Sequence, residues 1–380
     1  MEVSTFEHHL DSGWTIDEFP PLDSENTLVL VFGSRSYLHD GEAFGELRKA
    51  YPKAHIVGCS SSGEIHGTRV SDDTLSVAVT RFEKGRIKTA TVELSDLDES
   101  FDAGERLARE LAGDDMANFF VLSNGTHVNG TKLVEGINGV LDDDTIVTGG
   151  LAGDGDRFEK TWVLDGTQAN PHLIAGVAFY GDEFCVSHGS QGGWDRFGPV
   201  RSVTRSEGSV LYELDGKPAL ELYKRYLGDQ AEDLPATGLL FPLELHSDGD
   251  EERLVRTILA VDEDEQSMTF AGDIPQGEKV QLMKANFNRL VEGASDAAGH
   301  CAEMAQHDGG QALAIGISCV GRRLILKQRT EDELEAVVDT LPEGAQLVGF
   351  YSYGELSPYV SGADCALHNQ TMTLTVISER

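Results

Sequence analysis

Two short stretches far apart in the chain carry the same arrangement of glycine, serine and glutamate. Residues 58–65 read Gly-Cys-Ser-Ser-Ser-Gly-Glu-Ile, and residues 349–356 read Gly-Phe-Tyr-Ser-Tyr-Gly-Glu-Leu. Glycine lets a ligand approach the main chain, and several N–H groups that point one way suit a small polar or anionic ligand. Both stretches are therefore candidate ligand-binding turns.

The side chains of these stretches leave two interpretations open. Glu64 and Glu355 either bind an ammonium group or cap the element that follows. The tyrosines either line an aromatic wall or pack, and the serines either contact the ligand or shape its loop. Arg322 is the nearest cation for a carboxylate, with a surface or ion-pair role as the alternative. The candidate ligand-binding residues are Cys59, Ser60, Ser61, Gly63, Glu64, Arg322, Tyr351, Ser352, Tyr353, Gly354, Glu355, His368 and Asn369.

A hydrolase is the alternative from another functional class, with a serine or Cys59 as nucleophile. The hydrolase turn reads Gly-x-Ser-x-Gly after a strand. Residues 349–354 contain one residue too many for this pattern, and residues 58–62 lack its closing glycine. Residues 149–155, Gly-Gly-Leu-Ala-Gly-Asp-Gly, fit neither common nucleotide-binding pattern. We therefore expect no enzyme activity.

The spacing of the histidines matches no known motif for a metal ion held by protein side chains alone. None of the twelve falls in a His-Glu-x-x-His or two-histidine–carboxylate arrangement. A haem needs only one axial ligand and an apolar pocket, and His246 or His368 could supply that ligand. An ordinary hydrogen-bonded histidine is the other interpretation of each. No cofactor is predicted, and haem binding stays an alternative.

The elements around the two candidate turns occur in the same order. Apolar runs at 27–32 and 312–317 are followed by helical patterns at 41–50 and 331–338, and alternating strands at 74–79 and 371–376 follow the turns. Strands that alternate with helices indicate an α/β fold of mixed sheets and helices. We expect two related sheet-and-helix domains from a duplication, at 27–217 and 218–380, after a loosely held arm at 1–26.

Composition limits the partners. The 65 acidic residues outnumber the 30 lysines and arginines, for a formal charge of −35, which argues against nucleic acid and anionic membranes as partners. Five scattered cysteines fit a reducing compartment. The polar start and the lack of a long apolar run predict a soluble, cytoplasmic protein.

Several motifs in order resemble the FIST family, named for F-box and intracellular signal-transduction proteins. The first half carries residues 58–65 and 149–155, which resemble the N-terminal FIST domain. The second half resembles the C-terminal domain through Val-Gly-Arg-Arg at 320–323, residues 349–355, and His-Asn-Gln-Thr-Met-Thr at 368–373. The likeness covers nearly the whole chain after about residue 27.

This resemblance implies a sensory protein that binds a small ligand, such as an amino acid or a carboxylate. One branch of the family is similar to haem-binding nitric-oxide sensors that regulate histidine kinases. The family supplies no agreed catalytic residues. No kinase, methyl-accepting, cyclase or F-box segment lies within these 380 residues. We therefore expect the signal to pass to a separate protein, such as a histidine kinase.

Overall fold

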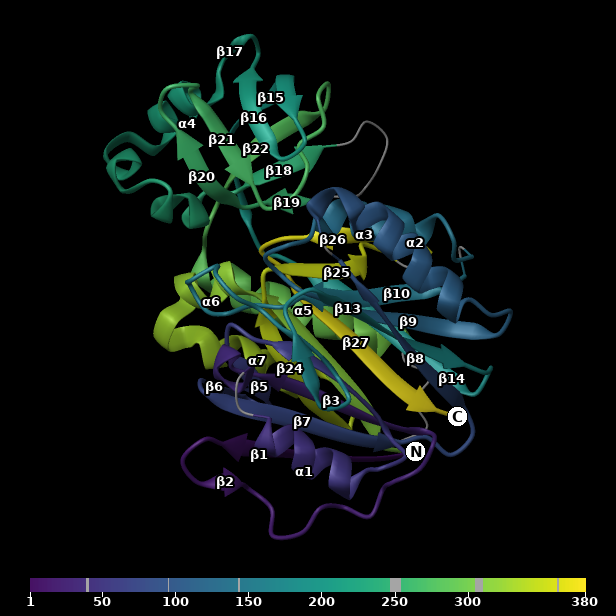
Figure 1. The fold of residues 1–380 in the computed structure, drawn as a ribbon. Helices are drawn as coiled ribbons and strands as arrows, with labels where there is room; N and C mark the ends of the chain where they lie inside the picture. The colour runs from purple at the N-terminus through teal and green to yellow at the C-terminus, as the bar shows by residue number, and fades with distance from the viewer. Residues whose placement is uncertain (39–40, 95, 143, 247–253, 305–309, 361) are drawn as a thin grey trace.

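The computed structural model is built from three similar sheet-and-helix units and one inserted domain (Figure 1). It describes residues 1–380 except 39–40, 95, 143, 247–253, 305–309 and 361. The predicted α/β class is confirmed. The predicted repeat is also present, and the structure adds a copy of it between the other two.

Unit 1 shows the plan that the others follow. Its central strand β3, Thr27–Gly33, is buried along its whole length. Leu28, Leu30 and Phe32 face the middle of the molecule, and the residues between them face helix α1, so the run is apolar on both sides. β3 pairs in parallel with the strand before the glycine-rich turn and antiparallel with the last strand of the unit. The elements of unit 1 are β1 Glu2–His9, β2 Gly13–Trp14, β3, η1 Arg35–Leu38, α1 Glu42–Ala50, β4 His55–Ser60, β5 Glu64–His66, β6 Arg69–Ser71 and β7 Thr74–Arg81.

Units 2 and 3 repeat this pairing around β9 and β23. Each also has a second helix packed beside the first, α2 on α3 and α5 on α7. Unit 2 comprises β8 Arg86–Glu93, η2 Leu97–Glu99, α2 Ser100–Leu111, β9 Met116–Ser123, α3 Gly130–Asn138, β10 Ile146–Leu151, β11 Val163–Asp165, β12 Gln168–Asn170 and β13 Leu173–Tyr180. Unit 3 comprises β14 Phe184–Gln191, α5 Phe287–Met304, β23 Ala312–Cys319, α6 Val320–Leu326, η5 Lys327–Arg329, α7 Thr330–Thr340, β24 Ala345–Ser352, β25 Gly354–Pro358, β26 Cys365–His368 and β27 Met372–Glu379.

The units exchange hairpins in a closed cycle. The hairpin β5–β6 of unit 1 extends the sheet of unit 3 through β24. The hairpin β25–β26 of unit 3 extends the sheet of unit 2 through β10, and β11–β12 of unit 2 extends the sheet of unit 1 through β4. Each sheet is therefore completed by another unit, and the glycine-rich turn is where the chain crosses from one sheet to the next.

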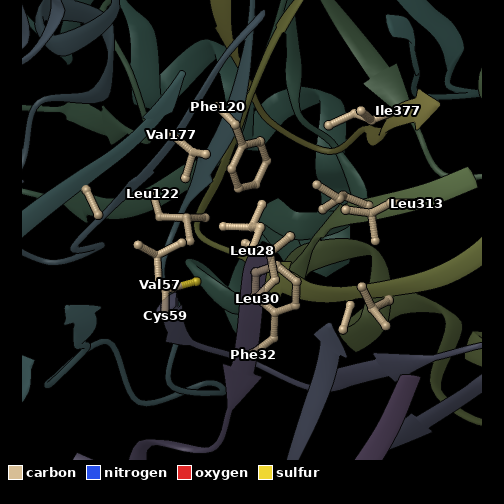
Figure 2. Packing of buried hydrophobic residues seen from close by; sticks show 14 of the residues in the cluster. Leu28, Leu30, Phe32, Val57, Cys59, Phe120, Leu122, Val177, Leu313 and Ile377 are labelled. Carbon is tan, nitrogen blue, oxygen red and sulfur yellow. The ribbon is translucent and has the colours of Figure 1, made fainter. Parts of the chain in front are cut away.

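The inner faces of the three sheets share one apolar core (Figure 2). Leu28 and Leu30 of unit 1, Phe120 and Leu122 of unit 2, and Leu313 of unit 3 belong to this cluster and are almost completely buried. The aromatic rings of Phe32 and Phe350 stack with centroids 4.9 Å apart. Because the cluster draws on all three units, the order of the units around it is fixed by packing.

The inserted domain, residues 195–284, lies between β14 and α5 and forms the separate lobe at the top of Figure 1. Its own apolar cluster packs α4 against its strands. The division expected at 217/218 falls inside its sheet, at β17, so that division does not separate two packed bodies. The elements are β15 Asp195–Glu207, β16 Val210–Leu214, β17 Lys217–Pro218, α4 Ala219–Leu227, η3 Gly228–Asp233, η4 Ala236–Leu240, β18 Leu243–His246, β19 Val255–Arg256, β20 Ile258–Asp262, β21 Ser267–Phe270 and β22 Lys279–Lys284.

The expected loose arm at residues 1–26 is wrong. Strand β1 pairs with β7 along its full length, from Glu2 opposite Arg81 to His9 opposite Thr74. Phe6 of β1 is buried and contacts Trp14 and Phe19 edge to face. Sequence periodicity missed β1 because its polar residues outnumber its buried ones.

Across the described residues, no helix combines the length and the apolar character that a membrane crossing requires.

Candidate functional site

Three glycine-rich turns meet at the centre of the molecule. We name them turn 1 (residues 58–64), turn 2 (149–155) and turn 3 (349–355). Each begins with a glycine whose added Cβ would overlap a main-chain carbonyl of the neighbouring parallel strand. Gly58, Gly149 and Gly349 therefore occupy equivalent positions, and residues 149–155 are a third copy of the predicted motif.

Main-chain hydrogen bonds join the turns in a ring. The N–H of Ser62 donates to the carbonyl of Tyr351 at 2.8 Å, that of Gly153 to Ser60 at 3.0 Å, and that of Tyr353 to Leu151 at 3.1 Å. Donors and acceptors are in each case the fifth and third residues of their turns. Three such bonds satisfy main-chain groups that the crossing chain would otherwise bury without partners.

Turns 1 and 3 are each closed by a glutamate–threonine pair. Glu64 accepts hydrogen bonds from the main-chain N–H and the hydroxyl of Thr74, at 3.1 and 3.0 Å. Glu355 accepts the same two bonds from Thr371, at 3.2 and 2.9 Å. Both carboxyl groups are almost fully buried, and this burial raises the pKa of each to about 8. The two glutamates therefore hold the turns to the last strands of their units.

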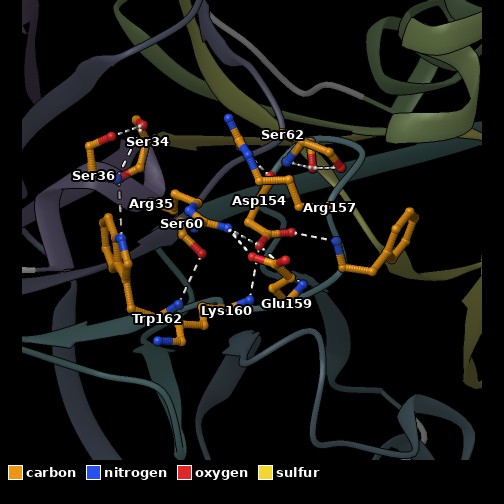
Figure 3. Close-up of polar contacts among 12 residues, drawn as sticks. Ser34, Arg35, Ser36, Ser60, Ser62, Asp154, Arg157, Glu159, Lys160 and Trp162 are labelled. Carbon is orange, nitrogen blue, oxygen red and sulfur yellow. Dashed lines mark hydrogen bonds and ion pairs between the residues drawn. The ribbon is translucent and has the colours of Figure 1, made fainter.

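Turn 2 lacks this glutamate–threonine pair and is held by hydrogen bonds to an aspartate instead. Gly155 stands where the other turns have glutamate, and Leu173 stands where they have threonine, as the strand registers show. The preceding residue, Asp154, accepts hydrogen bonds from the N–H groups of Phe158, Glu159 and Lys160 at 2.9–3.2 Å (Figure 3).

Asp154 also joins turn 2 to its surroundings. It accepts hydrogen bonds from the hydroxyl of Tyr353 and from Arg35. Burial alone would raise the pKa of Asp154, but the N–H groups of Lys160 and Glu159, the Tyr353 hydroxyl and Arg35 outweigh it and lower the pKa. Asp154 thus fixes the loop at residues 155–160 against the Tyr353 side chain.

A polar cleft of about 720 Å³ opens beside turn 1. Arg323 of α6 crosses it, donating to the carbonyl of Ser62 at 2.5 Å and to both carboxylate oxygens of Asp72 at 2.7 and 2.8 Å. Hydrogen bonds from Arg323 lower the pKa of Asp72, whose side chain is 68% exposed. Turn 1, the loop after turn 2 and α6 all contribute to the cleft. Its lining includes four basic residues, Arg35, Arg157, Arg323 and Lys327, and five acidic ones, Glu64, Asp72, Asp73, Asp156 and Glu331, together with Ser61, Val320 and Leu324.

A second, larger cleft of about 1550 Å³ lies on the other side of α6, between the units and the inserted domain. Its walls are largely apolar. They include Phe158, whose ring stacks on Tyr353 at 4.2 Å. Val320, Leu324 and Lys327 line both clefts, so α6 and the residue after it form a ridge between them.

The candidates Ser60, Ser61 and Gly63 of turn 1, and Ser62 between them, which was not a candidate, lie beside the polar cleft or support it. Ser61 and Ser62 line it. The Ser61 hydroxyl accepts from the N–H of Gly63 at 2.8 Å, and the Ser62 hydroxyl accepts from Gly155 at 3.0 Å. The Ser60 hydroxyl accepts from the N–H of Trp162 at 2.9 Å. These hydroxyls therefore already hold the turns together.

Other candidates lie in the core. Cys59 is completely buried among apolar side chains, and burial raises the pKa of its thiol well above its ordinary value, which disfavours a reactive thiolate. The Ser352 hydroxyl donates to Glu355 at 2.5 Å, and that of Tyr351 to Glu333 at 2.6 Å. Gly354 packs against Leu151 and Leu367.

Arg322 does not reach either cleft. Its guanidinium is fully buried, pairs with Glu333 at 2.8 Å, and donates to the carbonyls of Gly192, Leu290 and Gln370. Arg322 therefore serves as an internal ion pair, and Arg323 is the arginine of the cleft. Adjacent residues of a helix differ in direction by about 100°, so Arg322 can point into the core while Arg323 points into the cleft.

His368 and Asn369 lie at the joint between the units and the inserted domain. The Asn369 side-chain oxygen accepts from the N–H of Thr257 at 3.3 Å. Nearby, buried Arg256 donates to the carbonyl of Leu367 at 2.9 Å. These contacts tie the inserted domain to the end of β26. Asn369 thus has a positioning role at the joint.

The two histidines considered as haem ligands differ in their surroundings. His368 is fully buried, with Nε2 donating to the carbonyl of Ser357 at 2.9 Å, and burial lowers the pKa of its ring to about 4. His246 lies 3.4 Å from Glu244. Neither ring lines either of the two clefts. Among the described residues, no group of three or more histidine, cysteine, aspartate or glutamate side chains could hold a metal ion.

Sequence reasoning found Ser61, Glu64 and Tyr353 among the residues that line the clefts but missed others. Asp72, Lys327 and Phe158 lie outside the repeated motif, and Arg323 was passed over for its neighbour. One available signal was the strand that runs into Gly149, which places a glycine at position one of residues 149–155, as in the other two turns. The cleft itself depends on the hairpin exchange, which no local pattern indicates.

Comparison with known families finds the FIST N domain at residues 27–217 and the FIST C domain at residues 219–358. The chain is also 23% identical over 357 residues to a protein of Methanocaldococcus jannaschii named "Uncharacterized protein MJ1623". That match covers 83% of this chain and 66% of the relative, so the chain spans just under two thirds of the relative's length.

Among solved structures, a cyanuric acid hydrolase from A. caulinodans is similar with a TM-score of 0.33 and 8% identity, over 93% of this chain and 90% of that one. A likeness this low says nothing about the activity of this chain. FIST domains are sensor domains of signal transduction. Because the two domain matches cover most of its length, the chain belongs to the FIST family.

Proposed function

We propose that this chain is a non-catalytic sensor that binds a small carboxylate, such as an amino acid, in the polar cleft beside turn 1. The observation that carries the proposal is the placement of Arg323. Its guanidinium faces the cleft, contacts the main chain of turn 1 and is paired with an exposed aspartate. A planar guanidinium binds a carboxylate through two parallel hydrogen bonds.

In this proposal the ligand takes the place of Asp72 on Arg323. Asp72 is mostly exposed, so releasing it to water costs little. The ligand carboxylate would then contact residues from three parts of the fold: turn 1, the loop after turn 2, and α6. Ligands that bridge parts of a fold stabilise the arrangement in which those parts are closest.

The signal would leave through the inserted domain. That domain forms one wall of the larger cleft behind α6, so a shift of α6 changes the surface against which the domain rests. A separate signalling protein, such as a histidine kinase, would read the change. The binding free energy can shift this equilibrium only by the difference in affinity between the two arrangements.

A thermal-shift screen with amino acids and short carboxylates tests the proposal. A ligand at 100 times its dissociation constant stabilises the protein by about 2.7 kcal/mol. Arg323→Gln should abolish the shift, whereas Asp72→Asn should preserve or increase it because the competing carboxylate is gone. The control Arg81→Gln removes an ion pair with Glu2 far from the cleft and should leave binding unchanged.

Two results would contradict the proposed function or its exchange step. If every compound leaves the melting temperature unchanged, the proposed function is wrong. If Asp72→Asn abolishes binding as completely as Arg323→Gln, the ligand does not exchange with Asp72. Adding haemin to the screen tests the haem alternative, and serine- and thiol-directed probes test the hydrolase alternative.

A further inference from the structure

The large cleft behind α6 has an apolar surface that the polar ligand of the preceding section does not use. Among the described residues, nine large hydrophobic side chains are classed as exposed, and three of them line this cleft. They are Phe158, Leu259 and Phe287, at 47%, 44% and 46% exposure. They come from the loop after turn 2, from the inserted domain and from the start of α5, so the chain gathers exposed apolar groups from three distant segments.

The volume of this cleft is larger than a bound amino acid would fill. Ligand sites for small molecules enclose about 300–1000 Å³. The apolar cleft measures about 1550 Å³ and lies across the ridge formed by α6 from the polar cleft of about 720 Å³, with Val320, Leu324 and Lys327 lining both. A ligand that crosses the ridge would place one end beside Arg323 and Lys327 and the other among apolar side chains.

The cation at the crossing point is Lys327. It lines both clefts, and no hydrogen bond or ion pair of its ammonium group is found among the described residues. Arg323 lies four residues earlier, about one helical turn away along the chain. The two positive groups therefore mark the polar end of the path, while Phe287 and Leu259 lie on the apolar side.

We infer that the ligand is an amphiphilic acid: a carboxylate head held at Arg323 and Lys327, and an alkyl chain that lies in the apolar cleft. The inference rests on the proposed function and narrows its ligand class. The alkyl chain would touch both Leu324 of α6 and Leu259 of the inserted domain, so it would join the two bodies directly. An amino acid confined to the polar cleft could not do so.

The test is a series of straight-chain carboxylates, from butyrate to decanoate, titrated calorimetrically into the whole protein below their micelle concentrations. Each methylene that leaves water for the cleft should tighten binding about fourfold. With incomplete burial of the chain, decanoate should still bind at least 50-fold more tightly than butyrate. Equal affinities along the series would overturn the inference.

Variants at exposed positions locate the alkyl chain without endangering the fold. Leu259→Glu and Phe287→Glu should each weaken decanoate binding at least tenfold and leave butyrate unaffected. The matched control is Val200→Glu, since Val200 is 47% exposed on the inserted domain and lines neither cleft. If the control weakens decanoate as much as the cleft variants do, the binding is nonspecific and the inference is wrong.

The head group is tested with Lys327→Gln. This variant should weaken decanoate about fivefold and leave decan-1-ol, which has no charge, unchanged, whereas Lys49→Gln on the distant α1 should affect neither. Vesicles of an uncharged phospholipid should not retain the protein, because a free acid rather than a bilayer lipid fits between two domains. Retention by vesicles without binding of free decanoate would overturn the inference.

The inference and the proposed function fail in different ways. Binding of butyrate or an amino acid through Arg323, with no gain from a longer chain, overturns the inference and leaves the proposed function standing. A chain-length gain that survives Arg323→Gln supports the apolar site and contradicts the carboxylate exchange at Asp72.

Discussion

Turn 2 and its two counterparts solve one structural problem by different means. Turns 1 and 3 are each held by a buried glutamate that binds a threonine at or immediately before the start of the last strand. Turn 2 has glycine and leucine at these positions, and its Asp154 instead binds three N–H groups of the following loop. Glutamate and threonine are absent together, as expected if each is useful only with the other.

This difference distinguishes the features that all three turns require to fold from the features that only the candidate site requires. The ring of main-chain hydrogen bonds and the first glycine are common to all three turns. The Glu–Thr pair is present in two, and the loop that Asp154 organises is present in one. That loop carries Phe158 to the apolar cleft and Arg157 to the polar one. Turn 2 therefore lacks the Glu–Thr pair of the other two turns, and the loop that follows it forms part of the wall of the candidate site.

The largest effect is expected at the shared glycines. Gly58→Ala, Gly149→Ala and Gly349→Ala should each cost about 3 kcal/mol or more in unfolding free energy, because the added methyl group overlaps a carbonyl of a packed strand. Urea unfolding measures the cost. The control Gly45→Ala lies on α1 in open space and should be neutral or slightly stabilising. If one of the three behaves like this control, the turns are not equivalent.

The glutamates come next. Glu355→Ala should lower the unfolding free energy by about 3 kcal/mol, since buried Ser352 and Thr371 lose their common partner. Glu64→Ala should act similarly, and Glu355→Gln should cost only about 1 kcal/mol because the amide still accepts hydrogen bonds. The measurement is again urea unfolding. A neutral Glu355→Ala would show that the pair does not close the turn.

Asp154→Asn should cost about 2 kcal/mol, because a neutral amide is a weaker acceptor for the three N–H groups and for Arg35. It should also loosen the loop at residues 155–160, which faster amide hydrogen exchange there would reveal. Unchanged exchange would mean that the loop is held by other contacts. The same variant should weaken decanoate binding, because it displaces Phe158.

Stability should depend on pH through the buried glutamates. The folded-state pKa of Glu355, about 8, lies above its ordinary value of 4.5, so its contribution is complete below pH 4.5 and is lost as the pH rises toward 8. The free energy of wild type should therefore fall relative to that of Glu355→Gln across this range. Comparing the two proteins cancels the opposite trend of His188 and His368, whose pKa values are lowered to about 4. Parallel curves would contradict the prediction.

The smallest effect is expected at the edge of turn 2. Glu159→Gln removes an exposed ion pair with Arg35 and should change the unfolding free energy by less than about 0.5 kcal/mol. It serves as the control for Asp154→Asn, since both alter a carboxylate bound to the same arginine. If Glu159→Gln lowers the unfolding free energy by more than about 1 kcal/mol, part of the effect of Asp154→Asn comes from the exposed ion pairs of Arg35.

Particular residues show how far sequence reasoning reached. The α/β class, strand β3 and the repeated Gly–Ser–Gly–Glu pattern follow from local composition and spacing. Turn 2 was not recognised as a copy because it lacks the serine and glutamate by which the other two were found. Arg322 was chosen over Arg323 because spacing does not show which side of a short helix faces a cavity.

The sequence by itself determined the α/β class, the elements around the two recognised turns and the family, because apolar period, turn residues and motif spacing are local properties. Only the tertiary structure decided that each hairpin completes another unit's sheet, that Glu64 and Glu355 point at threonines, and that α6 divides two clefts. These features depend on contacts between residues tens to hundreds of positions apart. Such contacts form when apolar faces of three sheets bury one another, and no short stretch of sequence encodes them.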